Sequence, residues 1–162
     1  MKKITVLFTM LSVCFMFVIC QASTADEFAL GGVTLGMSKD DVKNIYGEPK
    51  QVDDKHSRDI CMYGDSFVLH FADGYVTSME IDDNNGIIMP AGFSVGSDSR
   101  EVVKYFGQNY GMRPDYRSYD DMYCADFIYF YPNKSAVILR VGYDCDDYKI
   151  CYIRIQASGI GI

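Results

Sequence analysis

The chain has 162 residues, with 15 Lys and Arg against 22 Asp and Glu, and it contains no Trp. A net charge of −7 without any run of basic residues disfavours nucleic-acid backbones and anionic lipid headgroups as partners, because such a chain repels both. It favours a basic protein surface instead. The length suffices for one compact domain or two small ones.

The first 25 residues predict a secretory signal peptide. Two lysines follow Met1, an apolar stretch covers residues 4–19, and residues 23–25 are small, as a cleavage site requires. Two alternatives are weaker. The stretch of 16 residues is short of the roughly 20 that a membrane-spanning helix needs, and Cys20, the candidate for a lipid anchor, follows the bulky Ile19. We therefore predict a periplasmic or extracellular protein, with no stable membrane insertion after processing.

Residues 32–47 and 92–107 carry the same landmarks in the same order, 60 residues apart. The matching positions are Gly32 and Gly92, Gly36 and Gly96, Val42 and Val102, and Gly47 and Gly107. A motif that returns without a gap predicts two tandem modules. We place the modules at residues 28–83 and 92–157, with residues 84–91 as the linker.

Each copy of the motif predicts a short amphipathic helix. In the first copy Ser38 is the expected N-cap, with a carboxylate three residues on. Val42, Ile45 and Tyr46 are expected to share the buried face, and Gly47 to end the helix.

The second copy predicts a matching helix that Ser97 or Asp98 caps and Gly107 ends. The expected buried face of this second helix comprises Val102, Tyr105 and Phe106.

Strand patterns follow each helix, so the predicted fold class is α+β. In the first module the expected strands are residues 50–53, 59–63, 66–71 and 75–81, and in the second they are residues 125–131, 135–143 and 149–157. Each module is thus a short helical segment followed by an antiparallel sheet of about four strands.

Four cysteines remain after the predicted cleavage, and an even number in an exported protein indicates disulfides. Three pairings are open. Cys145 and Cys151 flank a polar turn between two strands, which favours a bridge across that hairpin. This leaves Cys61 with Cys124, a bridge that would tie the two modules together. Neither CxxC spacing nor histidine ligands indicate a metal, so we expect none.

The motifs of enzymes and cofactor sites are absent from the sequence. His56 and His70 are the only histidines, and no G-x-S-x-G, H-E-x-x-H or phosphate-binding glycine loop occurs. Adjacent acids such as Asp146 and Asp147 could supply the carboxylates of a glycosidase or a calcium site. Adjacent acids in turns are, however, usually solvated or cap the backbone. We predict neither enzyme activity nor a cofactor.

Thirteen Tyr and ten Phe are a heavy aromatic load for this length. Tyrosine offers contact area at a small entropic cost, so a sheet face rich in Tyr129, Tyr131 and Tyr143 indicates a protein interface. The alternative is that the alternation of Phe127, Tyr129 and Tyr131 marks the core side of a strand.

The motif Gly-Met-Ser-Lys-Asp-Asp-Val at residues 36–42, the Gly-Glu-Pro at residues 47–49 and the Phe-x-Asp-Gly-x-Val turn at residues 71–76 carry a resemblance to a known family. They resemble the module that β-lactamase inhibitor protein shares with the small lipoprotein of the outer-membrane β-barrel assembly machinery. The tandem arrangement, export and length are more similar to the inhibitor. The resemblance implies two sheets joined into a saddle with a concave face.

Inhibitors of this family grip a partner with the concave face and with two turns, which correspond here to residues 63–66 and 131–134. The residues that the resemblance assigns to binding are Tyr63, Gly64, Asp65, Ser66, Tyr131, Asn133 and Lys134, with Tyr129 and Tyr143 added from the aromatic pattern. Gly64-Asp65 resembles the turn that the inhibitor inserts into an enzyme's active site, whereas the second turn and the cysteine positions depart from its pattern.

The sequence therefore predicts an exported protein-binding module, either an inhibitor or an envelope assembly scaffold. The expected partner is a protein such as an extracytoplasmic hydrolase, and not a nucleic acid. The alternative function is a small-ligand or glycan binder that uses the aromatic face as a stacking platform.

Overall fold

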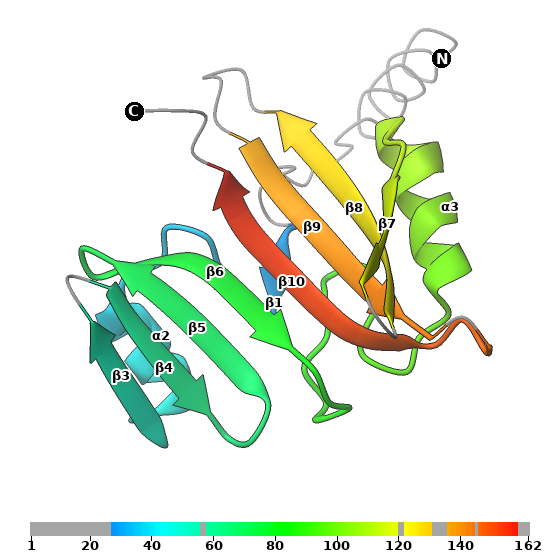
Figure 1. Cartoon of the computed structure of the whole chain (residues 1–162). Coiled ribbons are helices and arrows are strands. Elements are labelled where there is room, and N and C mark those ends of the chain that lie inside the picture. The colour runs from blue at the N-terminus through cyan, green and yellow to red at the C-terminus, as the bar shows by residue number, and fades with distance from the viewer. Residues whose placement is uncertain (1–26, 56–57, 120–121, 131–135, 145, 159–162) are drawn as a thin grey trace, which may run out of the picture.

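The computed structural model describes residues 27–55, 58–119, 122–130, 136–144 and 146–158 (Figure 1). Several sequence predictions lie outside these residues, namely the signal peptide, the lipid-anchor candidate Cys20, the turn residues Tyr131, Asn133 and Lys134, and Cys145.

The described chain is α+β, as predicted, with a two-stranded sheet and an eight-stranded sheet. The helices are α2 (Lys39–Tyr46) and α3 (Ser99–Tyr110), and β1 (Ala29–Leu30) pairs with β2 (Val33–Thr34). The large sheet contains β3 (Gln51–Lys55), β4 (Arg58–Tyr63), β5 (Phe67–Ala72), β6 (Tyr75–Ile81), β7 (Asp115–Tyr119), β8 (Met122–Phe130), β9 (Ala136–Tyr143) and β10 (Ile150–Ser158).

The strand order of the large sheet is β3-β4-β5-β6-β10-β9-β8-β7, and every neighbouring pair is antiparallel. The strands that follow α2 in the chain make one half of the sheet, and those that follow α3 make the other (Figure 1). The halves meet where β6 pairs with β10, with Ser78–Ile81 opposite residues 153–156. This pairing makes one continuous sheet.

Helix α2 begins and ends where the sequence predicts. The Ser38 hydroxyl accepts a hydrogen bond from the Asp41 backbone N–H at 3.1 Å, and Gly47 follows the last turn with a φ of +77°. One expectation for this helix is wrong. Val42 is buried and Tyr46 half-buried, but Ile45 is 51% exposed, because it lies on the side of the helix that faces away from the sheet.

Helix α3 is longer than predicted. Asp98 is its N-cap and accepts a hydrogen bond from the Arg100 backbone N–H at 2.9 Å. Gly107 does not end the helix. It lies within the helical ladder, because a glycine adopts helical angles at a modest cost. The left-handed residue that closes the helix is Gly111, with a φ of +64°, and its N–H bonds back to the Gly107 carbonyl.

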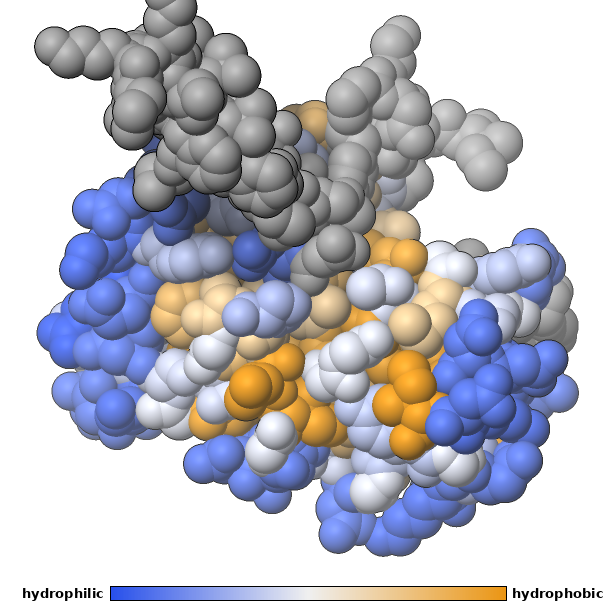
Figure 2. Space-filling model, turned by 180° about the vertical axis from the view of Figure 1, so that it is seen from behind, coloured by the Kyte–Doolittle hydropathy of each residue, from blue (hydrophilic) through white to orange (hydrophobic). Residues whose placement is uncertain are grey.

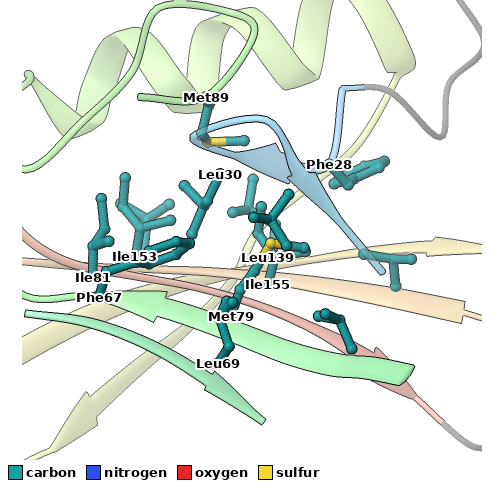
Figure 3. Close-up of a cluster of buried hydrophobic side chains, with 14 of the residues drawn as sticks. Phe28, Leu30, Phe67, Leu69, Met79, Ile81, Met89, Leu139, Ile153 and Ile155 are labelled. Atoms are coloured by element: carbon teal, nitrogen blue, oxygen red, sulfur yellow. The ribbon is translucent and has the colours of Figure 1, made fainter. Parts of the chain in front are cut away.

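The core lies on one face of the large sheet, beneath α2, α3 and the β1-β2 pair (Figures 1 and 3). In Figure 3, Leu30 and Met89 approach the sheet from above, toward Met79, Leu139 and Ile155 on the strands. Figure 2 views this helix side and shows apolar surface between two hydrophilic margins. The burial of the core side chains between the sheet and these elements is the main favourable term in the free energy of folding.

The sequence analysis missed three strands. β1 and β2 have only two residues each, too few to produce a period, and β7 has the sequence Asp-Tyr-Arg-Ser-Tyr, which contains no aliphatic residue. β7 forms because it pairs with residues 122–126 of β8 at the edge of the sheet.

No helix among the described residues has the length and apolar character needed to cross a membrane.

Phe28, near the N-terminal end of the described residues, packs against α3 and β8. Its ring centroid lies 5.8 Å from that of Phe106 on α3 and 5.7 Å from that of Tyr129 on β8, and its side chain is fully buried. We expect Phe28→Ala to lower the free energy of unfolding by about 3–5 kcal/mol, the usual cost of deleting a buried ring.

The matched control is Phe130→Ala, because Phe130 is 60% exposed. Urea denaturation of both variants checks the prediction. Equal stability losses for the two substitutions would contradict the packing described for Phe28.

Candidate partner-binding face

The second face of the eight-stranded sheet has no cover among the described helices and strands (Figure 1). We call it the open face. Its side chains alternate along each strand with those of the core face. They include Ile60 and Met62 on β4, Val68 and His70 on β5, Ser78 and Glu80 on β6, Tyr152, Arg154 and Gln156 on β10, Ile138 and Arg140 on β9, and Cys124, Asp126, Ile128 and Phe130 on β8.

Two acid–arginine pairs form a row across the middle of the open face. The strand register places Glu80, Arg154, Arg140 and Asp126 opposite one another on β6, β10, β9 and β8. Two arginines directly opposite each other would repel. This arrangement is stable because a carboxylate lies on the outer side of each arginine.

The Arg140–Asp126 pair is bidentate. The guanidinium Nε donates to Asp126 Oδ1 and Nη2 donates to Oδ2, both at 2.7 Å. The Asp126 side chain is only 5% exposed, and Arg117 of β7 also approaches it, with Nε 3.5 Å from Oδ2. A bidentate pair of this kind fixes the direction of the arginine side chain.

Glu80 accepts hydrogen bonds from three side chains. Tyr152 donates its hydroxyl at 2.6 Å, Arg154 donates Nε at 2.8 Å, and His70 Nε2 lies 3.0 Å from the other carboxylate oxygen. Burial opposes the ionisation of Glu80, but the bonds from His70, Tyr152 and Arg154 and the charge of Arg154 prevail and lower its pKa to about 2. Burial and the Glu80 carboxylate both raise the pKa of Tyr152. Glu80 is therefore ionised and held in place.

Two hollows interrupt the open face. A shallow groove of about 560 Å³ has walls from Ile60, His70, Ser78, Arg154 and Gln156, among others. A notch of about 300 Å³ is bounded by Met122, Cys124, Arg140 and Tyr152. Both polar and apolar side chains line these hollows, a mixture typical of protein interfaces.

The first predicted binding turn lies where expected, between β4 and β5. Gly64 has a φ of +65°, which a glycine adopts without strain, and the exposed Asp65 carboxylate forms an ion pair with Lys50. The first and last residues of the turn, Tyr63 and Ser66, are not surface residues. Ser66 is buried and accepts a hydrogen bond from Asn85 Nδ2 at 2.8 Å, and Tyr63 is buried on the core face.

The predicted tyrosine-rich open face is wrong. Tyr129 lies opposite Val137 on the core face, with its ring against Phe28. Tyr143 also lies on that side, where its ring stacks between those of Tyr123 and Tyr148. Packing against the N-terminal strand and α3 favours this side, because it removes the ring faces from water.

The two predicted turns are not neighbours. Tyr63 shares a row of the sheet with Ala125 on β8, and β8 continues for five residues beyond Ala125 before it ends at Phe130. Five residues cover about 17 Å, and the five strand spacings between β4 and β8 cover about 24 Å. The end of β8 and the Asp65 turn are therefore roughly 30 Å apart, on a diagonal of the sheet.

The predicted Cys61–Cys124 bridge is wrong. Cys61 lies on the core face of β4, whereas Cys124 lies on the open face of β8, and four strands separate them. A disulfide needs Cα atoms within about 7 Å, and the sheet keeps these roughly 24 Å apart. Cys151 is exposed on β10, and its predicted partner Cys145 is outside the described residues, so their bridge stays a prediction.

The sequence analysis missed the charged row. The sequence did contain a signal for it, because a single arginine interrupts the mostly apolar sequence of each strand, Arg140 in β9 and Arg154 in β10. A charged residue within an otherwise apolar strand indicates the uncovered face. The partners Glu80 and Asp126 depend on the pairing of strands far apart in sequence.

Within the described residues no three His, Cys, Asp or Glu side chains gather as ligands for a metal ion.

Comparison of the chain with protein-family models, with curated proteins and with solved structures gives no match. The resemblance to β-lactamase inhibitor protein stays a prediction from sequence motifs.

The pKa of Glu80 predicts how stability responds to acid. Because folding lowers this pKa from 4.5 to about 2, the stabilisation is complete above pH 4.5 and is lost as the pH falls toward 2. The difference corresponds to about 3 kcal/mol. We expect Glu80→Gln to lower the free energy of unfolding at pH 7 by up to this amount and to flatten its pH dependence between pH 4.5 and 2.

The control is Glu101→Gln, since Glu101 lies exposed in the first turn of α3, and its ion pair with Lys104 is long, at 3.4 Å. Such a surface pair contributes about 0–1 kcal/mol. Urea titrations at several pH values measure both effects. An unchanged pH dependence in the Glu80 variant would contradict the role of this carboxylate.

Proposed function

We propose that the protein is an exported protein-binding module and that the open face of its eight-stranded sheet is the binding surface. The observation that carries this proposal is a wide sheet whose second face no described element covers, and on which charged side chains are held in fixed positions.

The dimensions of the open face suit a protein partner. Eight strands at about 4.8 Å spacing are about 34 Å wide, and strands of five to nine residues are about 17–30 Å long. The face therefore covers roughly 700–800 Å², close to the share that one partner contributes to a standard protein interface. A small ligand would contact only a fraction of it.

The chemistry of the face supports the same conclusion. Ile128 and Phe130 are 42% and 60% exposed, next to the fixed pair of Arg140 and Asp126. Apolar contact provides affinity, and positioned charges select the partner and reject others. The ion pairs already hold the side chains of Arg140, Asp126, Arg154 and Glu80 in place. Binding therefore costs little entropy for these charged side chains.

The proposal includes two tandem modules joined into a saddle. Matching backbone hydrogen bonds support it, since each motif holds the hairpin of its own half. In the first half the bonds run from Gly36 N–H to Val76 O, from Val76 N–H to Met37 O and from Lys39 N–H to Gly74 O. The matching bonds of the second half run from Gly96 N–H to Ile150 O, from Ile150 N–H to Ser97 O and from Ser99 N–H to Tyr148 O. Gly36 and Gly96 adopt similar left-handed angles, with φ of +81° and +91°.

On this proposal the partner is an extracytoplasmic protein, and the activity is inhibition of an enzyme such as a hydrolase or support of envelope assembly. The Asp65 turn contributes a carboxylate at one end of the sheet. A protein that contacts both this turn and the end of β8 spans roughly 30 Å, which fits a standard interface.

The alternative of glycan binding has less support. It requires exposed ring faces as a stacking platform, and the described Phe and Tyr rings that strand alternation places on the open face are those of Tyr75, Phe130 and the half-buried Tyr152, on three different strands. Saccharide binding without protein capture would nevertheless favour it.

Affinity capture from an envelope extract tests the proposal with two matched substitutions. Ile128 on the open face and Ile45 on α2 are similarly exposed, so Ile→Asp at each costs little stability. We expect Ile128→Asp to lose a protein that the wild type retains, and Ile45→Asp to keep it. Asp65→Ala, which removes only an exposed ion pair, is expected to weaken retention.

Retention by the Ile128 variant together with loss in the Ile45 variant would place the interface on the helix side and contradict the proposal. Capture of no protein at all would favour a small ligand.

A further inference from the structure

Two sulfur-containing side chains border the notch beside β9. Met122 and Cys124 are two residues apart on β8 and therefore share its open face. Cys124 lies directly opposite Gly142, and both residues border the notch of about 300 Å³ with Arg140 and Tyr152.

Gly142 makes room for the methionine sulfur. A Cβ at this glycine would lie 2.5 Å from Met122 Sδ and 3.2 Å from Tyr152 Cβ. The thioether of Met122 therefore lies over Gly142, which is also the residue directly opposite Cys124. A larger residue at position 142 would displace the thioether and close the notch between β8 and β10.

The Cys124 thiol has the features of an unused ligand. Its side chain is fully buried at the edge of the notch, and no described residue forms a hydrogen bond with it. Burial raises the pKa of this thiol, and the positive charge of Arg140 opposes the rise.

Sulfur ligands select soft ions. Thiolate and thioether bind Cu(I) well, whereas Mg²⁺ and Ca²⁺ prefer oxygen ligands. The carboxylate of Asp126, two residues from Cys124, already binds Arg140 through both of its oxygens, and that of Glu80 binds Tyr152 and Arg154. The notch therefore offers two soft ligands to an ion and lacks a free carboxylate for a hard one.

We propose that Met122 and Cys124 form a binding site for one Cu(I) ion at the notch beside Gly142. On binding, the Cys124 thiol releases its proton to solvent, and its sulfur and that of Met122 each donate an electron pair to the metal. The copper remains Cu(I), so no oxidant or reductant is needed.

Titration of the purified protein with Ag(I) tests this site, because Ag(I) shares the ligand preference of Cu(I) and does not change oxidation state in air. Calorimetry with glutathione as competitor measures the number of ions bound and their affinity. We expect one tight equivalent for the wild type, its loss in Cys124→Ser, and at least tenfold weaker binding in Met122→Leu, which keeps the volume of the side chain.

Two cysteine controls have expected results of their own. Cys61→Ala, on the opposite face of the sheet, and Cys151→Ser, at the exposed start of β10, both keep the tight equivalent. Far-ultraviolet circular dichroism confirms that each variant is folded.

The proposal is overturned if the wild type binds no more Ag(I) than Cys124→Ser, or if the tight equivalent disappears with Cys61→Ala or Cys151→Ser. Unchanged affinity in Met122→Leu would also overturn it, because the site would then be a single thiol.

Discussion

The pairing of β6 with β10 is the interaction on which the rest of the structure depends. Four residue pairs, from Ser78 opposite Gln156 to Ile81 opposite Ile153, join two groups of four strands. The pairing also fixes which side chains meet, because a shift of one residue would exchange the two faces of a strand. With this register Met79 and Ile155 enter the core together, and Glu80 lies against Arg154 on the other side.

The two faces of the sheet follow from this register. The helices, the β1-β2 pair and the chain around Met89 cover one face and exclude water from it (Figure 3). The other face carries the row from Glu80 to Asp126, in which each charge has an opposite charge beside it. A charged row of this kind agrees with the partner-binding role that we propose for this face.

The sequence predicts the local structure well, because local signals determine it. Ser38 caps α2 as expected, and the class is α+β. Six of the seven predicted strands lie within two residues of their predicted positions, while β8 begins three residues early. Some failures are local, such as the end of α3, which Gly111 and not Gly107 closes. The failures that concern the binding face depend on distant pairing. Alternation along β8 separates Tyr129 from Ile128 but does not say which of them faces the helices. The order of the strands, which a sequence does not reveal, places Cys61 far from Cys124.

The most direct test of the open face is hydroxyl-radical footprinting of the protein alone and bound to the partner that it captures. The account predicts protection of Met62, Ile128 and Phe130 on the open face, and unchanged oxidation of Ile45 and Ile88 on the helix side. Protection of Ile45 and Ile88 with continued oxidation of Ile128 and Phe130 would contradict it.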